Sequence, residues 1–486
     1  MAKDDKRKRC EEVNKDMISG LPNVIIGHIL SFLPTKDALC TCILSKSWRE
    51  LWRSLSNFDF DDRTWKSRII FGNFMDRFFY VHNSRENSIT KFRLRVHGNY
   101  PSSRLSQWID AAIKDNVEEL ILWIPLLTHV PLPRRVFSCE KLVVLNLRYG
   151  IDIDLLGVGV RFSCLKVLHL EGLPILDDLA SIEKLLAGSP VLEELKIEHE
   201  YCRSRNALRV CSSSLKRLTI RFTRIRYYRK DPGCRALTLD TPNLELLILT
   251  DFVSEELNMQ QLPCSLVEAS ISVAFTHFFI IQLDTYIDMA VQFLRLIMPI
   301  VRILRLCGTT MRVSFFLILL LCLNCQRSDD APPHMFTPIQ ILSNAVRKKL
   351  PRFEDLPNFQ NLTRLEIEAS GDCRWMVLHE ILKCSVKLEV FILYKDDTSV
   401  IPKWRNPEFA PRCMRSSLKV IECVDFEGDF AEIEMAEYFI KNALVLEKMA
   451  IRFGWGMTRN SKERVAKRLS GCQIGSEACR ITFSSP

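Results

Sequence analysis

Apolar residues recur along most of the chain with one spacing. A leucine-like residue is followed by two variable positions, a second leucine-like residue, one variable position and a third. Most neighbouring copies lie about 23 to 30 residues apart, the period of repeat proteins that stack into solenoids. The copies contain Phe92 and Leu94; Leu120 and Leu122; Leu142, Leu145 and Leu147; Leu165, Leu168 and Leu170; Leu192, Leu195 and Ile197; Leu215, Leu218 and Ile220; Leu244, Leu247 and Leu249; Val301, Leu304 and Leu306; Leu362, Leu365 and Ile367; Leu388, Phe391 and Leu393; Leu418 and Ile421; Leu446, Met449 and Ile451.

This spacing predicts leucine-rich repeats, each with one short strand whose apolar side chains point inward. A single copy cannot bury its leucines, so neighbouring copies must stack. Segments between the strands, such as DDLASIEKLLAGSP, have helical periodicity and a Gly-Ser-Pro stop. The predicted fold is therefore α/β: a curved solenoid with parallel strands inside and helices outside. An ordinary α/β domain with leucine-rich strands is the alternative, and the many repeated copies argue against it.

A different pattern precedes the repeats. Pro22 suits a first helical turn, and an apolar stripe of Ile25, Ile26, Ile29, Leu30 and Leu33 follows at helical spacing and stops at Pro34. Thr35 can cap a second helix, which carries Leu39, Cys42 and Ile43; Ser45 can cap a third, which carries Trp48, Leu51 and Trp52. Three helices of this size bury too little surface to be stable alone. We therefore expect them to pack on the body of the chain or on a partner protein.

The residues of this stretch resemble the F-box of plant F-box proteins. The resemblance is carried by Leu21-Pro22, by ILSFLPTKDAL and by LSKSWRELW, in that order; Asn23 departs from the acidic residue more common there. Membership of the family implies a three-helix module that binds the Skp-type adaptor of a cullin-RING ubiquitin ligase. It also implies that certain residues divide between adaptor contact and the module's own core: Leu21, Pro22, Ile29, Leu30, Leu33, Leu39, Ile43, Trp48 and Trp52.

The C-terminal region, from about Pro402, resembles the FBD region that follows the repeats in many plant F-box proteins. It contains an SLKV strand, a DFEGD turn and a helix expected from Glu432, with Ala436, Phe439, Ile440, Ala443 and Leu444 on one face. We expect an α/β cap that covers the last open repeat. The predicted organisation is a disordered tail at 1–15, an F-box at 16–56, repeats at 57–400 and the FBD-like region at 401–486.

Residues 313–340 interrupt the repeats. The apolar part of this segment is about thirteen residues long, which is too short for the ~20 residues of a membrane-spanning helix. Removing the segment restores a regular gap between copies, and its Val-Ser start and Gln end fit the codons found at intron borders. We therefore interpret it as a retained intron translated in frame, and a loop folded onto the solenoid is the alternative.

Composition limits the chemistry. The chain of 486 residues is 47% hydrophobic and 26% charged, which is typical of globular proteins. Its 18 cysteines follow no disulfide framework, and no apolar leader is seen, so we expect a reducing compartment, the nucleus and/or the cytoplasm. Cys322 with Cys325, and Cys40 with Cys42, lack further metal-ligand spacing and are interpreted as buried thiols. No catalytic motif is found, and no cofactor or metal is expected.

A basic run could contact a target. RFTRIRYYRK interleaves basic and aromatic residues after a repeat strand, a composition suited to an acidic or phosphorylated peptide or to nucleic acid. The candidate target-binding residues are Arg224, Arg226, Arg229 and Lys230, and a solvated edge is the alternative. A weak nuclear-import patch is possible at residues 6–9, where solvated charge is again the alternative.

The resemblance predicts a non-catalytic substrate-recognition subunit of an SCF-type ubiquitin ligase. The F-box would bind the Skp-type adaptor and the repeats would hold a target near the charged ubiquitin. Two alternatives stay open. One is an adaptor-binding scaffold without ligase function, and the other is a nucleic-acid or chromatin-binding repeat protein; the F-box accounts for more residues than the basic run does. No membrane partner is expected.

Overall fold

The computed structural model describes most of the chain in two compact units, Met1–Lys196 and Ile197–Pro486. The described residues are 21–44, 48, 52, 55–83, 88–114, 117–173, 179–199, 207–222, 236–251, 256–259, 263–273, 296–307, 359–369, 375–395, 407 and 409–485. The predicted tail at 1–15, the segment 313–340 and the basic run with Arg224, Arg226, Arg229 and Lys230 lie outside these residues. None of the helices in the described ranges is long and apolar enough to cross a membrane.

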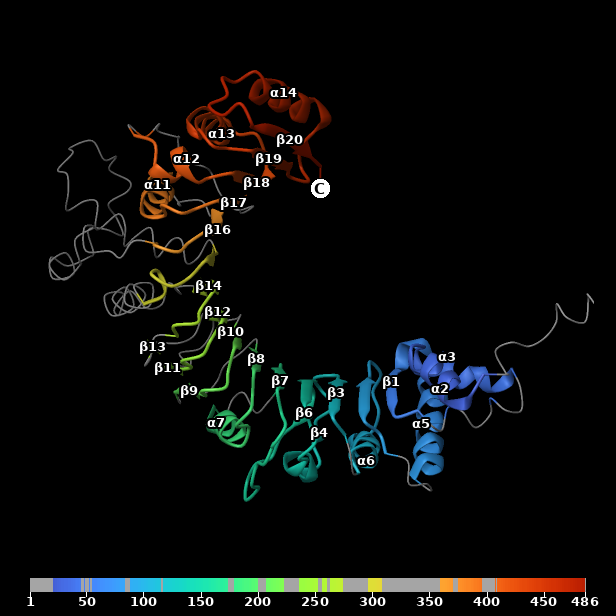
Figure 1. Cartoon of the computed structure of the whole chain (residues 1–486). Helices are drawn as coiled ribbons and strands as arrows, with labels where there is room; N and C mark the ends of the chain where they lie inside the picture. The colour runs from blue at the N-terminus through green and yellow to red at the C-terminus, as the bar shows by residue number, and fades with distance from the viewer. Residues whose placement is uncertain are drawn as a thin grey trace, which may run out of the picture. The chain divides into compact units, whose positions relative to one another are not determined.

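The N-terminal unit begins with short helices and continues as parallel strands (Figure 1). Its sheet has the order β1-β2-β3-β5-β7-β8, and β4 pairs with β6. Its helices are α2 (Asn23–Ser31), α3 (Thr35–Cys40), η1 (Thr41–Ile43), η3 (Asp62–Thr64), α5 (Arg68–Asn83), α6 (Ser102–Ala112), η4 (Arg134–Ser138) and α7 (Leu179–Ala187). Its strands are β1 (Asn57–Asp61), β2 (Lys91–Arg95), β3 (Glu119–Ile124), β4 (Val130–Pro131), β5 (Val144–Tyr149), β6 (Ile151–Asp152), β7 (Val167–Glu171) and β8 (Glu194–His199), within which the unit ends.

The apolar positions of the repeat pattern form continuous rows across these strands. Phe92 pairs with Leu120, which pairs with Leu145, and Leu145 pairs with Leu168. All four side chains are buried. A parallel sheet in exact register keeps equivalent residues on one face, so each repeat completes the core of the next. The predicted parallel leucine-rich-repeat architecture is confirmed.

The C-terminal unit continues the same plan. Its main sheet contains β10-β12-β14-β15-β16-β17-β18-β19-β20, in that order. The strands are β9 (Leu208–Cys211), β10 (Arg217–Phe222), β11 (Ala236–Asp240), β12 (Leu246–Asp251), β13 (Glu256–Met259), β14 (Glu268–Val273), β15 (Ile303–Leu306), β16 (Arg364–Ala369), β17 (Val390–Lys395), β18 (Val420–Phe426), β19 (Lys448–Phe453) and β20 (Arg480–Ser484). The helices are α11 (Trp375–Cys384), α12 (Arg412–Ser416), α13 (Phe430–Asn442) and α14 (Arg459–Ser470).

Two features of this unit were absent from the sequence-based prediction. Strand β14 is a repeat copy in which Ala269 takes a leucine position, between Leu247 of β12 and Leu304 of β15. The small side chain hides this copy from a search for leucine spacing. In addition, β9, β11 and β13 form a second parallel sheet from the segments between main-sheet strands, where the prediction had only helices.

The helix expected from Glu432 begins two residues earlier. Asp429 and Glu432 form a reciprocal capping box, which fixes the start of α13 at Phe430. The helix ends at Asn442, so Leu444 lies beyond it and is half exposed instead of packing on the expected face. The boundary differs because the capping residue precedes the apolar stripe from which the prediction was made.

Candidate functional site

The N-terminal helices expose an unusual amount of apolar surface. Within residues 21–44 eight large hydrophobic side chains are exposed: Leu21, Val24, Ile25, Ile29, Phe32, Leu33, Ile43 and Leu44. Val24 and Ile43 are more than four-fifths exposed, at 81% and 84%. Exposed apolar residues are normally scattered singly, and a concentration of this kind indicates a protein-binding surface. We call these eight residues the helical apolar face.

The opposite side of the helices is fixed to the repeats. Ile26, Leu30, Ala38 and Trp48 are buried. The Thr35 hydroxyl accepts a 2.6 Å hydrogen bond from the backbone N–H of Asp59 in β1. Thr35 was predicted to cap the second helix, and this prediction is wrong: α3 has no side-chain cap, and Pro34 precedes it. Because the hydroxyl is engaged with the first repeat strand, it is not available to the helix.

Further contacts join the helices to the turn after β1 and to α5. The Lys36 ammonium lies 5.5 Å from the centre of the Trp65 ring and donates a hydrogen bond to the carbonyl of Thr64. The rings of Trp52 and Phe78 lie 6.1 Å apart. These contacts leave the helical apolar face turned away from the repeats of its own unit, and so able to meet another protein.

The nine F-box residues named from the sequence fall into three groups. Leu21, Pro22, Ile29, Leu33 and Ile43 are exposed; Leu30 and Trp48 are buried; Leu39 and Trp52 are half buried. The sequence reasoning did not assign Val24, Phe32 and Leu44 to the site, although they are among the most exposed of the eight. Val24 and Phe32 lie beside the apolar stripe that helical periodicity identifies. They were missed because such a stripe mainly identifies residues that face the core. Ser45 and Leu51 lie outside the described residues.

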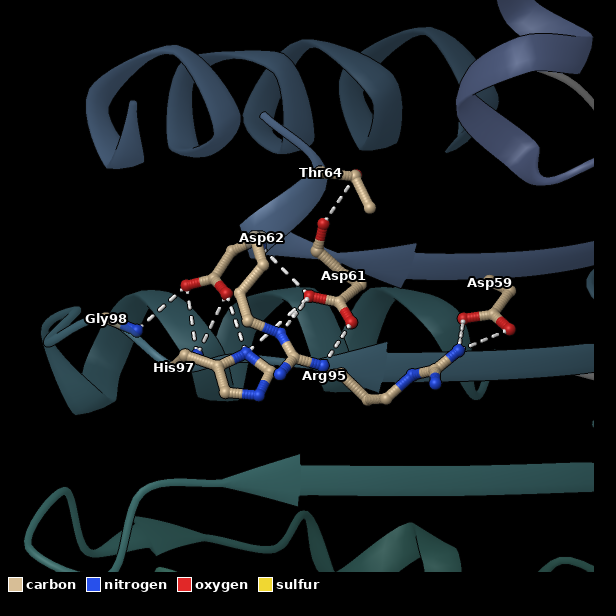
Figure 2. Close-up of polar contacts among 8 residues, drawn as sticks. Asp59, Asp61, Asp62, Thr64, Arg95, His97 and Gly98 are labelled. Atoms are coloured by element: carbon tan, nitrogen blue, oxygen red, sulfur yellow. Dashed lines mark hydrogen bonds and ion pairs between the residues drawn. The ribbon is translucent and has the colours of Figure 1, made fainter. Parts of the chain in front are cut away.

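A polar cluster fixes the repeat strand on which the helices rest (Figure 2). The Asp62 carboxylate accepts hydrogen bonds from the backbone N–H groups of His97, at 3.0 Å, and Gly98, at 2.8 Å. The His97 Nδ1 atom lies 3.0 Å from Asp62 Oδ1 and 3.6 Å from Asp61 Oδ1. These three side chains have the composition of a metal site. The hydrogen bonds already present explain why these side chains lie together: they connect the end of β1 to the end of β2.

The pKa of the neighbouring Asp61 is set by its contacts in the same region. Burial alone would raise the pKa of Asp61, but hydrogen bonds from the side chain and backbone of Arg63 outweigh it and lower the pKa. Alongside it, the Arg95 guanidinium donates to both oxygens of Asp59 at 2.8 Å. These contacts hold the side chains of Asp59 and Asp61 in place on β1, the strand that contacts Thr35.

The thiols differ in part from the prediction of buried cysteines. Cys40 is exposed and Cys42 is half buried, because both lie on the short turn-like segment α3–η1 away from Ala38. Cys322 and Cys325 lie outside the described residues. Farther along the chain, Cys413 is buried, and burial raises the pKa of its thiol to about 12, which keeps it protonated and unreactive.

Three family matches agree with this architecture. Residues 18–60 match the F-box domain family. Residues 105–325 match the family described as FBD-associated F-box protein At5g56370, LRR repeats, and residues 406–451 match FBD. The chain thus combines an F-box, leucine-rich repeats and an FBD region. The F-box match contains the whole helical apolar face together with residues 57–60 of β1, the strand that the helices contact.

Similar proteins from Arabidopsis thaliana carry all or part of this organisation in their names. The chain is 29% identical to F-box/LRR-repeat protein At4g14103 over 78% of its own length and 91% of that protein. It is 29% identical to F-box/LRR-repeat protein At3g59200 over 97% of its length and 89% of the relative. It is 26% identical to F-box/FBD/LRR-repeat protein At2g26030 over 96% of its own length and 99% of that protein.

Proposed function

We propose that this protein is the substrate-recognition subunit of an SCF-type cullin-RING ubiquitin ligase. In this proposal the F-box binds the Skp-type adaptor, the repeats hold a target protein, and other subunits carry out ubiquitin transfer. Proteins of the F-box/LRR family generally serve as SCF substrate adaptors. The observation that carries the proposal for this chain is the helical apolar face, which the contacts within its own unit leave uncovered.

The energetics favour a partner for this face. Each exposed leucine, isoleucine or phenylalanine that a partner covers contributes on the order of 1.5–3 kcal/mol. The side of the helices that contacts β1 and α5 is held by Thr35 and Lys36. A partner can therefore dock without first unfolding or reorienting the helices, which keeps the entropic cost of binding low.

The first experiment measures adaptor binding by single-site variants of the full chain. Val24→Asp and Ile43→Asp introduce charge into the helical apolar face, and each should weaken binding of a purified Skp-type adaptor at least about tenfold, or ~1.4 kcal/mol. Leu127→Asp is the matched control, because Leu127 is also exposed, at 87%, but lies between β3 and β4. Equal losses in all three variants, or no loss in any, would remove the proposal.

The second experiment separates a ligase subunit from a scaffold. The full chain and the Ile43→Asp variant are used to capture proteins from plant extract, and the adaptor and the cullin are both scored. Capture of both by the intact chain alone supports the ligase subunit. Capture of the adaptor without the cullin favours the scaffold, and a salt-sensitive nucleic-acid complex without adaptor favours the chromatin-binding alternative.

We also propose that the protein works in the nucleus and/or the cytoplasm. The support is its cysteine usage: 18 cysteines without a disulfide framework, which is typical of reducing compartments. Imaging of a fluorescent fusion should show signal in one or both of these compartments. Signal confined to the secretory pathway would contradict this assignment.

A further inference from the structure

The two terminal strands of the repeat units differ in how they are covered. At the start of the N-terminal unit, Phe58 and Phe60 of β1 are buried beneath α5, and Thr35 satisfies the Asp59 N–H. In the C-terminal unit, β20 is the last strand of its sheet and pairs with β19. Its Ile481 and Phe483 are only half buried, whereas their β19 partners Met449 and Ile451 are buried. Residues 409–485 thus continue the sheet beyond β17, and in the described ranges no further strand pairs with β20.

The backbone of β20 has one free edge. Arg480 donates its N–H to the carbonyl of Glu447, at 2.9 Å, so Arg480 and every second residue after it face β19. The N–H and C=O groups of Ile481 and Phe483 consequently point away from the sheet. Nothing in residues 409–485 takes up these groups. An edge of this kind is a template for one more strand.

The side chains around this edge determine which kind of strand could pair with β20. The last 42 residues contain eight basic and three acidic residues, and so carry more than half of the net charge of +9. Arg480 is exposed on β20 itself, and the Lys462 Nζ atom lies 3.3 Å from Ser485 Oγ, directly after the strand. On the other face, Ile481 and Phe483 offer half-buried apolar surface, and the ring of Phe483 stacks 5.9 Å from that of Phe453.

We propose that β20 binds an extended, acidic segment of a partner protein as an additional strand. Acidic side chains at alternate positions would face Arg480, and apolar side chains between them would cover Ile481 and Phe483, on the face where the Lys462 Nζ atom lies 5.8 Å over the Phe453 ring. A second copy of the chain fits less well, because α14 has five basic residues and one acidic residue, and two such helices would repel each other. The site lies in the C-terminal unit and does not depend on the F-box proposal.

The test uses the full chain and synthetic peptides. The probe is a labelled octapeptide of alternating glutamate and valine, compared with a glutamate–proline peptide of equal charge and with a lysine–valine peptide. Proline prevents a regular β ladder, so only the glutamate–valine peptide combines negative charge with strand formation. Fluorescence anisotropy should show at least about tenfold tighter binding of this peptide than of either of the others. Equal binding of the two acidic peptides would reduce the interaction to charge alone and overturn the proposal.

Variants of the chain test whether the glutamate–valine peptide binds at the free edge of β20. Phe483→Pro and Phe483→Ala both remove the ring, but only Phe483→Pro also removes the outward N–H, so it should lose at least about tenfold more affinity. Reversal of charge in the Lys462→Glu, Arg480→Glu double variant should weaken binding to a similar extent. The matched control is Arg412→Glu, Arg415→Glu, which reverses two exposed charges on α12. Equal effects of the two charge reversals would contradict the location.

Two further measurements keep the test decisive if a variant fails to fold. In the unmodified chain, amide hydrogen exchange of residues 478–485 should slow when the glutamate–valine peptide binds; protection elsewhere without protection here overturns the proposal. Sedimentation identifies the competing occupants. If the chain forms a dimer that Phe483→Pro dissociates, the edge binds a second copy. If a single-stranded oligonucleotide binds in place of the acidic peptide, the basic surface binds nucleic acid. Either result overturns the acidic-strand proposal.

Discussion

The hydroxyl of Thr35 accepts a hydrogen bond from the backbone N–H of Asp59 across 24 residues of sequence. Thr35 is the first residue of α3, and Asp59 is the middle residue of β1. Thr35 is buried, with 4% of its surface exposed, and Asp59 is half buried. The bond satisfies an outward N–H of the first repeat strand and fixes the F-box helices on the strand edge.

Replacement of Thr35 by valine tests this joint. The substitution keeps the side-chain shape and leaves the Asp59 N–H without an acceptor, so we expect a loss of about 1–3 kcal/mol in local stability. Amide hydrogen exchange at Asp59 should accelerate accordingly. Thr64→Val is the control, because Thr64 is exposed and donates only to the nearby carbonyl of Asp61. Unchanged exchange at Asp59 would show that the bond does not hold the joint.

Removing the Asp62 side chain should lower the free energy of unfolding more than removing the Asp59 side chain. Asp62→Ala leaves the N–H groups of His97 and Gly98 without their acceptor, and we expect a cost of about 2–4 kcal/mol. Asp59→Ala removes a more exposed ion pair with Arg95 and should cost less than about 1 kcal/mol. Hydrogen exchange of β1 and β2 gives both values. Similar costs for the two variants would contradict the role assigned to Asp62.

Acid should weaken the N-terminal unit. The pKa of Glu119 is lowered: burial opposes the shift, but Arg93 and Lys91 outweigh it, and the pKa of Asp61 is lowered as well. Groups with a lowered folded-state pKa contribute stability above their unfolded values of about 4 and lose it as the pH falls through the folded values. Unfolding measured between pH 6 and 3 should show this loss, and Arg93→Gln should reduce it. An unchanged profile in that variant would contradict the assignment.

Glu432 should have the opposite pH dependence. Burial raises its pKa against the influence of Lys395, whose Nζ lies closer to Glu427 and Asp429, at 2.5 and 2.8 Å, than to Glu432, at 3.6 Å. A raised folded-state pKa favours the protonated form, so this contribution is present at low pH and is lost as the pH rises through the folded value. Glu432→Gln should remove it. The readout is the pH dependence of hydrogen exchange in α13, corrected for intrinsic exchange rates.

Two glycines of the N-terminal unit should respond differently to alanine. A Cβ atom at Gly150 would lie 2.0 Å from the carbonyl oxygen of Pro125, so Gly150→Ala must displace backbone and should lower stability by about 1–3 kcal/mol. A Cβ atom at Gly159 would have nothing within 4 Å, and Gly159→Ala should be neutral or slightly stabilising. Thermal unfolding of the two variants compares them directly. Equal midpoints would show that the chain near Gly150 relaxes freely.

The repeat architecture follows from the sequence because its signal is local and repeated. Leu145 and Leu147 lie two residues apart on a strand, and the same spacing recurs in every neighbour, so the rows of the core can be read from the chain alone. The copy with Ala269 was missed because one alanine breaks that signal; its place is decided by Leu247 and Leu304 on the adjacent strands. The F-box was likewise recognised from residues in a fixed order.

Only the tertiary structure decided which apolar residues form surface and which form core. Helical periodicity places Ile29 and Leu30 on one stripe, yet Leu30 is buried and Ile29 is 40% exposed. The difference depends on tertiary packing: α3 contacts α2, and the Thr35–Asp59 bond joins α3 to β1, which comes later in the chain. The same holds for the Thr35–Asp59 and Asp62–His97 bonds and for the open edge of β20. Local spacing determines the elements, whereas contacts between distant residues determine which of their faces remain free to bind.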